Sequence, residues 1–213
     1  MKIKMNIILL LREKILIKKL KQYNIKYFYI KFKNKIKMTF SLILGPMYSG
    51  KTSELLRLVD RKAIAGKSCL VVKYEADNRY NTDENTLSTH DGNRHKAVPC
   101  NGKLLESNIN FEKYDVIAID EGQFMSDLPQ FVEKYVKNKN IIVSALAGTF
   151  ERKPWVSISN SLPYASNVEF LTAVCGECNS ENACYNKKIN GNKNQVTEVG
   201  GKDIYQSQCN NCF

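Results

Sequence analysis

The clearest chemistry in this sequence lies in the octapeptide Gly45-Pro46-Met47-Tyr48-Ser49-Gly50-Lys51-Thr52, which has the spacing Gly-x4-Gly-Lys-Thr. This spacing is typical of a loop that wraps the phosphates of a nucleotide, because its glycines let backbone N–H groups turn inward around phosphate oxygens. The ammonium of Lys51 could reach the β- and γ-phosphates, and the hydroxyl of Thr52 could ligate Mg²⁺. An ordinary Gly-Pro turn would leave the Lys-Thr pair unexplained, so the motif predicts binding of a nucleoside triphosphate.

A pair of acidic residues, Asp120 and Glu121, follows the apolar run 115–119. We expect Asp120 to hold Mg²⁺, because a hard cation prefers oxygen ligands. Glu121 could then accept the proton of the attacking oxygen, which is either a water or a substrate hydroxyl. A carboxylate is a weak base toward an alcohol, so this proton would move late in a transition state governed by positioning. The alternative is a solvated strand end, and the pair alone does not separate an ATPase from a kinase.

Four cysteines form two Cys-x2-Cys pairs, Cys175 with Cys178 and Cys209 with Cys212. Four thiolates in two turns suit tetrahedral Zn²⁺, and a site closed by four cysteines is structural rather than catalytic. Residues 175–213 contain few apolar groups, and a segment this short rarely folds without disulfides or a structural metal ion. Zinc contributes about 10–16 kcal/mol in peptide models, so we predict a zinc site rather than free thiols.

The residues between the two cysteine pairs, 179–208, are more numerous than in the usual zinc ribbon. Residues 195–199, the pair Gly200-Gly201 and the pair Ile204-Tyr205 indicate a hairpin or a looped excursion. Zinc would anchor both of its ends, which lowers the cost of holding the loop closed. The excursion is therefore either a lid over a second substrate or a solvated surface loop.

Elements that bring these groups together can be predicted from the apolar pattern. Continuous apolar runs predict strands at residues 40–44, 69–72, 115–119, 141–146 and 168–174, with a shorter element at 95–100. Helical spacing predicts helices at 53–65 and 128–136 and a weak helix at 103–107, and a long polar loop covers 77–94.

Buried strands that alternate with helices are typical of a parallel sheet covered on both faces. The phosphate-binding motif leaves the carboxyl end of its strand, where such sheets bind ligands. We therefore predict an α/β fold over residues 38–174, in the form of a P-loop NTPase-like parallel sheet with helices on both faces. The composition changes at Cys175, so residues 175–213 are predicted to form a small zinc-binding domain.

The net charge of +11 is confined to the first 37 residues, which hold eleven Lys, one Arg and one Glu. The remaining residues carry equal numbers of basic and acidic side chains, so the body has no basic excess that would attract a polyanion. The apolar stretch 7–11 is too short to span a bilayer. A mitochondrial targeting segment and a basic membrane-surface helix are the alternatives for residues 1–37. We expect them to form a dispensable basic extension, with Met38 as an alternative start.

Several motifs together resemble the cellular, zinc-containing type of thymidine kinase, the type II deoxythymidine kinase family. The resemblance runs from about residue 40 to residue 212. The matching segments are 45–55, 72–74, 89–91, 119–124, 148–154, 171–175 and 200–201.

This resemblance implies ATP-dependent phosphorylation of the 5′-hydroxyl of thymidine to give dTMP, with Glu121 as the general base. Residues implied for ATP and Mg²⁺ are the octapeptide 45–52 with Asp91, Gly92, Asn93, Asp120 and Gln123, where Thr52 and Asp120 face the magnesium. Residues implied for the nucleoside are Met47, Phe124, Phe150, Val196, Thr197, Glu198, Val199, Gly200 and Tyr205, of which the last six belong to a lasso loop in the zinc-binding domain. The resemblance also implies a cytoplasmic homotetramer that is inhibited by dTTP. From the charge distribution and the apolar pattern we expect a protein that binds neither nucleic acid nor membrane.

Two other functions are compatible with part of the sequence. In a P-loop ATPase, Glu121 would activate water, and ATP turnover would not depend on a nucleoside. A zinc-ribbon module that binds nucleic acid, with a vestigial phosphate loop, is the third reading. The neutral charge of residues 38–213 argues against it.

Overall fold

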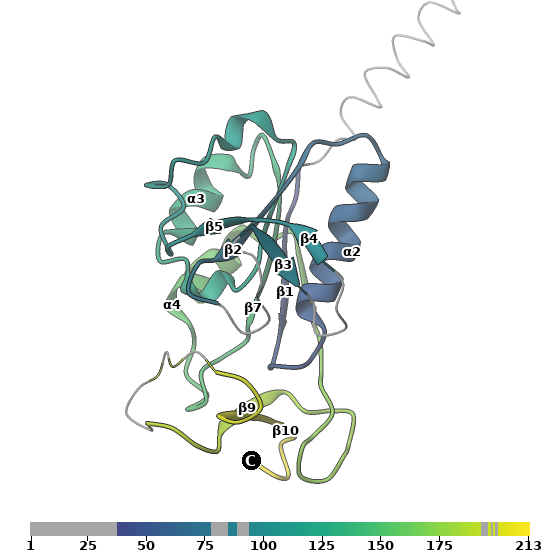
Figure 1. Ribbon diagram of the computed structural model, residues 1–213, viewed down its shortest axis with the longest axis vertical. Helices are drawn as coiled ribbons and strands as arrows, with labels where there is room; N and C mark the ends of the chain where they lie inside the picture. Colours follow the sequence, from purple (N-terminus) through teal and green to yellow (C-terminus); the bar gives the residue numbers. More distant parts are fainter. Residues whose placement is uncertain (1–37, 78–84, 89–93, 193–195, 197, 199) are drawn as a thin grey trace, which may run out of the picture. The chain divides into compact units, whose positions relative to one another are not determined.

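The computed structural model describes residues 38–77, 85–88, 94–192, 196, 198 and 200–213. Its centre is a six-stranded sheet with the order β5-β2-β6-β7-β1-β8, in which every neighbouring pair is parallel (Figure 1). The strands are β1 (Phe40–Gly45), β2 (Cys69–Tyr74), β5 (Val98–Cys100), β6 (Val116–Ile119), β7 (Asn140–Leu146) and β8 (Asn167–Phe170). The predicted α/β fold with a parallel sheet is confirmed.

Helices cover both faces of this sheet because successive side chains of a buried strand point to opposite sides. The helices are α2 (Lys51–Ile64), α3 (Leu128–Tyr135) and α4 (Val156–Ser161). Figure 1 shows α2 on one side of the sheet, and α3 and α4 on the other. Leu55 and Val59 of α2 pack against Ile43 and Ala118. The opposite core joins α3 and α4 to alternate sheet residues, namely Phe40, Leu42, Leu70, Val72, Ile117, Ile119, Ile141 and Val143.

Three predicted elements differ from the structure. Residues 103–107 form bends and a turn rather than a weak helix, because Asp127 accepts the N–H groups of Leu104 and Leu105. The predicted element 95–100 divides between two sheets, with β4 (Arg94–Lys96) pairing antiparallel to β3 (Thr86–Ser88) and β5 joining the central sheet. The last predicted strand ends at Phe170, and β8 is exposed rather than buried because it forms an edge of the sheet.

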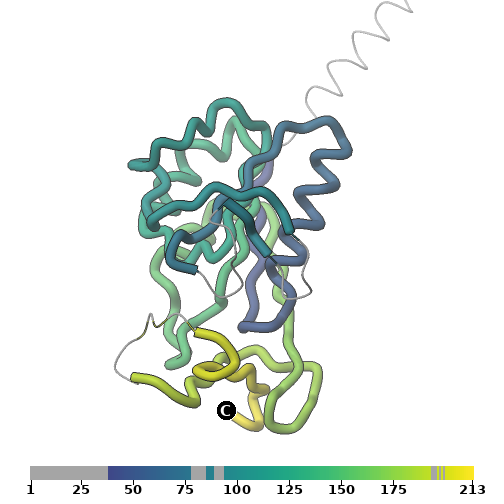
Figure 2. The backbone as a smooth tube through the Cα atoms, viewed as in Figure 1, coloured from purple at the N-terminus to yellow at the C-terminus, as the bar shows by residue number. Residues whose placement is uncertain are grey.

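The cysteine-rich segment contains a second, smaller sheet in which β9 (Tyr185–Lys188) pairs antiparallel with β10 (Tyr205–Gln208). Figure 2 shows this segment below the central sheet, on the side where the loop after β1 lies. The strand β9 escaped prediction because its sequence, Tyr-Asn-Lys-Lys, is polar. Burial alternates along β9, and Asn186 and Lys188 are its two buried residues.

Short 3-10 helices complete the connections, at η1 (Phe111–Lys113), η2 (Gly122–Phe124) and η3 (Leu162–Tyr164). Within the described residues, no helix combines the length and the apolar character that a membrane span requires.

Candidate active site

The octapeptide 45–52 joins the end of β1 to the start of α2 and is called here the candidate phosphate loop. Gly45 is tightly enclosed, because a Cβ atom there would lie 2.5 Å from the carbonyl oxygen of Leu171. Gly50, the residue before the helix, has a φ of 80°, which a glycine adopts without strain. The Nζ of Lys51 donates to the carbonyl oxygen of Pro46 at 2.6 Å, so the ammonium lies against the loop. The loop leads directly into the N-terminus of α2, where the first N–H groups of a helix lack partners within the helix and can bind an anion.

Asp120 follows β6 and lies in contact with the candidate phosphate loop. Thr52 Oγ1 lies 3.1 and 3.2 Å from the two carboxylate oxygens of Asp120, and the hydroxyl of Ser144 on β7 also donates to Asp120. Burial, followed by the negative charge of Glu121, raises the pKa of Asp120 to about 6. A divalent cation would relieve both effects, because it compensates the two charges. Thr52 and Asp120, predicted for magnesium, are therefore brought together with oxygen ligands suited to a hard cation.

Glu121 occupies a left-handed backbone conformation, with a φ of 53°, directly before η2. A residue with a Cβ adopts this conformation at a cost of about 1–2 kcal/mol, and such strain concentrates at functional sites. The Nε2 of Gln123 donates to the Glu121 carboxylate, and the Oε1 of Gln123 accepts the N–H of Leu146 at 3.0 Å. Gln123 thus connects Glu121 to β7 and fixes where its carboxylate points.

A pocket opens beside Glu121. Of the residues predicted from the sequence, those around it are Met47, Glu121, Gln123, Phe124, Phe150, Val196, Glu198, Gly200 and Tyr205. Phe124 stacks on Tyr74 at 4.6 Å between ring centroids and meets Trp155 edge-on at 5.7 Å. These aromatic contacts fix one wall of the pocket, and a flat ring could lie against it.

Some predicted residues lie outside the part of the chain that the structure describes. They are Asp91, Gly92 and Asn93, expected near ATP, and Thr197 and Val199, expected in the lasso loop.

The pocket also contains residues that were not predicted as site residues, and Asp77 and Asn186 are two of them. Asp77 follows the carboxyl end of β2, and its negative charge also raises the pKa of Asp120. The rule that ligands bind at the carboxyl ends of parallel strands could have found it. Asn186 lies on β9, and its Oδ1 accepts the N–H of Met47 at 2.7 Å. No local pattern marks Asn186, because its role depends on how the cysteine-rich segment packs against the candidate phosphate loop.

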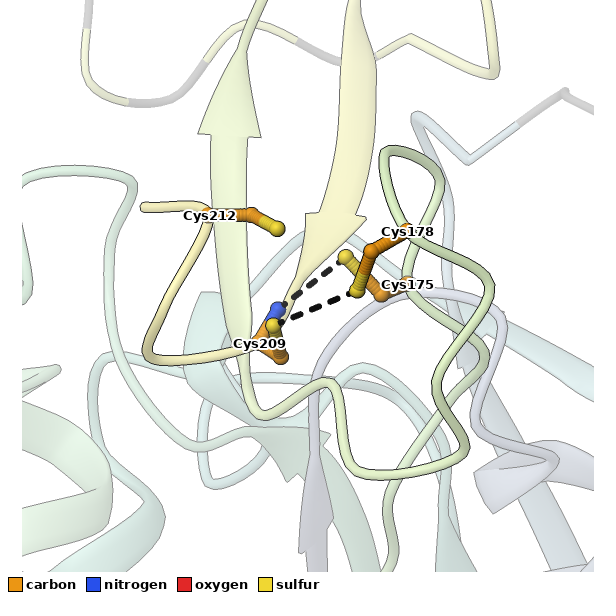
Figure 3. A group of neighbouring side chains, drawn as sticks. All are labelled: Cys175, Cys178, Cys209 and Cys212. Carbon is orange, nitrogen blue, oxygen red and sulfur yellow. Dashed lines mark hydrogen bonds between the residues drawn. The ribbon is translucent and has the colours of Figure 1, made fainter.

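The four predicted cysteine ligands converge in the structure, as Figure 3 shows. The Sγ atoms of Cys175, Cys178, Cys209 and Cys212 all lie within 4.8 Å of one another. The distance between the Sγ atoms of Cys178 and Cys209 is 3.7 Å, and tetrahedral Zn–S bonds of about 2.3 Å separate sulfurs by about 3.8 Å. Hydrogen bonds from the backbone N–H groups of Cys178 and Cys209 lower the pKa of Cys175 to about 6, which favours the thiolate. The cluster could therefore hold a metal ion.

The fold and the site together define a class of protein. A parallel α/β sheet carries a candidate phosphate loop after β1, and two carboxylates stand at the carboxyl end of β6, which β7 separates from β1, with a pocket beside them. This is the arrangement of nucleotide-binding proteins that transfer or hydrolyse phosphoryl groups.

Comparison with known proteins identifies the family. The family model described as thymidine kinase matches residues 38–213. The thymidine kinase of vaccinia virus (strain Ankara) is 43% identical over 173 residues, which cover 81% of this chain and 94% of the viral protein. Raccoon poxvirus thymidine kinase is 44% identical with the same coverage, and thymidine kinase 1 of Dictyostelium discoideum is 43% identical over 176 residues, 81% of this chain and 76% of that protein. The chain therefore belongs to the thymidine kinase family.

Proposed function

We propose that this protein transfers the γ-phosphate of ATP to the 5′-hydroxyl of thymidine, giving dTMP and ADP. The observation that carries the proposal is the position of Glu121, which lines the pocket. Asp120, the residue before it, contacts the candidate phosphate loop. One carboxylate pair thus borders both a site for phosphates and a space for a second substrate. Membership in the thymidine kinase family and the names of the relatives support thymidine as that substrate.

In this proposal the candidate phosphate loop binds ATP. Its backbone N–H groups and the N-terminus of α2 receive the phosphates, and the ammonium of Lys51 moves from the Pro46 carbonyl to the β- and γ-phosphate oxygens. Asp91, Gly92, Asn93 and Gln123 complete the ATP site, as the resemblance implies. The hydroxyl of Thr52 and the carboxylate of Asp120 would hold Mg²⁺, which when bound neutralises charge on the transferring phosphoryl group.

The chemical step needs one base and one leaving group. The 5′-oxygen of the nucleoside forms a bond to the γ-phosphorus, while the bond from that phosphorus to the bridging oxygen breaks and ADP leaves. Glu121 accepts the proton of the 5′-hydroxyl and later returns it to solvent. Gln123 holds the carboxylate in place during this transfer, because it bridges Glu121 and Leu146.

The pocket beside Glu121 suits the nucleoside. Phe124 and Phe150 offer flat apolar surfaces to the base, and Met47, a buried residue of the candidate phosphate loop, also lines the pocket. The residues predicted for the lasso loop, Val196, Thr197, Glu198, Val199 and Gly200 with Tyr205, would recognise the base mainly through their backbone. A site with fixed buried polar groups rejects a base that would leave them unpaired.

We further propose that Cys175, Cys178, Cys209 and Cys212 bind structural Zn²⁺. The sulfur spacing and the lowered pKa of Cys175 support this assignment. The metal would hold the two ends of the segment that carries β9 and β10, and would take no part in phosphoryl transfer.

We also propose a homotetramer that is inhibited by dTTP, as the resemblance implies. An exposed strand edge supports self-association, because β8 is the last strand of the described sheet and leaves Val168 and Phe170 about half exposed. The cytoplasmic location implied by the resemblance stays a prediction, as does the division into residues 1–37, 38–174 and 175–213.

A coupled assay of ADP release across the four natural deoxynucleosides tests the proposed function. We expect ADP release to rise steeply with thymidine and far less with deoxycytidine, deoxyadenosine or deoxyguanosine. ADP release at the same rate without any nucleoside would instead support an ATPase, in which Glu121 activates water.

A further inference from the structure

A buried lysine contacts residues that line the pocket. Lys188 is on β9, and only 1% of its side chain is exposed. A buried ammonium is expensive unless it is paired and hydrogen-bonded, because it loses its hydration. No step of the proposed phosphoryl transfer uses Lys188, so its burial requires another explanation.

The contacts of Lys188 reach several separate parts of the chain. Its Nζ forms an ion pair with the carboxylate of Glu198 and donates to the carbonyl oxygen of Asn192 at 2.6 Å. The same Nζ lies 5.4 Å from the ring centroid of Phe150 and 5.7 Å from that of Tyr205, which is within the range of cation–π attraction. Glu198, Phe150 and Tyr205 all line the pocket.

Glu198 has further contacts that hold it against the lysine. Its carboxylate accepts the N–H of Asn192 at 3.2 Å, and its carbonyl oxygen accepts the hydroxyl of Tyr205 at 2.9 Å. Gly191 packs closely on the same carboxylate, since a Cβ there would lie 2.6 Å from Glu198 Oε2, and its φ is +84°. The Glu198 carboxylate thus cannot leave Lys188 without also losing the hydrogen bond from the N–H of Asn192.

We propose that the buried Lys188 and the partly buried Glu198 form a clasp that positions the nucleoside-facing wall of the pocket. The inference rests on the proposed function. Phe150, Tyr205 and Glu198 come from three different segments, and the ammonium of Lys188 is the group that all three contact. Both residues are positioning residues, and neither touches the phosphates or the transferred proton.

The test is steady-state kinetics on Lys188→Met, Glu198→Gln and the double variant. We expect the KM for thymidine to rise at least about tenfold in each single variant, while kcat at saturating thymidine and the KM for ATP stay within about twofold. The double variant should raise the KM by much less than the product of the two single effects, because the two residues act on each other. Lys188→Arg keeps the charge and should restore part of the affinity.

Lys187→Met is the matched control, because Lys187 neighbours Lys188 on β9, is only half-buried and should leave all three constants unchanged. The clasp would be overturned if the variants lost affinity for ATP and thymidine equally. It would also be overturned if the rise in the KM for thymidine in the double variant equalled the product of the two single rises. If Lys188→Met does not fold, Glu198→Gln decides, since it preserves the volume of the side chain. A KM for thymidine that rises at least about tenfold with an unchanged KM for ATP would then support the clasp, and equal losses of both affinities would overturn it. If ADP release by the wild-type protein did not depend on thymidine, the proposed function would be refuted. If the wild type were active with thymidine and the variants had the same KM, only the clasp would be refuted.

Discussion

The Oδ1 of Asn186 accepts the backbone N–H of Met47 at 2.7 Å, and both residues are buried. This hydrogen bond joins β9 of the cysteine-rich segment to the candidate phosphate loop across 139 positions of the chain. A second contact lies nearby, where the Nζ of Lys202 is 5.6 Å from the ring centroid of Tyr48. The segment expected to wrap the nucleoside therefore also contacts the loop expected to hold ATP.

Asn186→Ala should weaken the binding of both substrates. The variant removes the acceptor of the Met47 N–H, and leaving a buried donor unsatisfied costs about 1–3 kcal/mol. We expect the KM values for thymidine and for ATP to rise together, each by about fivefold or more. Asn182→Ala, at an exposed position of the same segment, is the control and should change neither value. A change confined to one substrate would argue against a link between the two sites.

Glu121→Gln should abolish most of the turnover and preserve the fold. The amide keeps the size of the side chain but cannot accept the proton of the 5′-hydroxyl, so we expect kcat to fall by about 10²–10⁴-fold. ATP affinity, measured by equilibrium binding, should stay close to wild type. Glu106→Gln, which alters an exposed acid paired with Lys103, is the matched control. A kcat within twofold of wild type would remove Glu121 from the role of base.

Cys209→Ser should reduce the content of bound zinc and disturb the pocket. Three thiolates hold zinc less tightly than four, and β10, which carries Tyr205, ends directly before Cys209. We expect less than one zinc per chain by elemental analysis and a higher KM for thymidine, or loss of the folded cysteine-rich segment. Cys184→Ser is the control, because Cys184 is not one of the four clustered thiols. Normal zinc content and kinetics in Cys209→Ser would refute the site.

Asp115→Asn should destabilise the protein in a manner that depends on pH. Hydrogen bonds from the backbone N–H and the hydroxyl of Ser68 lower the pKa of Asp115 below its ordinary value of 3.8. A group with a lowered pKa in the folded state stabilises the fold above its unfolded pKa, and this contribution is lost as the pH falls. The difference in melting temperature between wild type and Asp115→Asn should thus be constant above about pH 5 and shrink below pH 3.8. A difference that grows as the pH falls would contradict the assignment.

The local patterns of the sequence were enough to predict the residues of the candidate site. The candidate phosphate loop, the Asp120-Glu121 pair and the two Cys-x2-Cys turns are short contiguous motifs, so their residue types and spacing can be read without a fold. The strands of the central sheet were predicted for a similar reason, since a strand buried on both faces is a continuous apolar run such as 141–146.

Only the tertiary structure decided how the polar residues work together. Ser144 donates to Asp120 from the neighbouring strand β7, and Asn186 accepts from Met47, from which it is 139 positions away in the sequence. Lys188 pairs with Glu198 from a strand whose sequence is polar. Hydrophobic periodicity carries no information about such partners, because a polar residue is buried only where the fold supplies a hydrogen bond or an opposite charge. The sequence thus determined which groups are candidates for the chemistry, and the packing of distant segments determined what holds them in position.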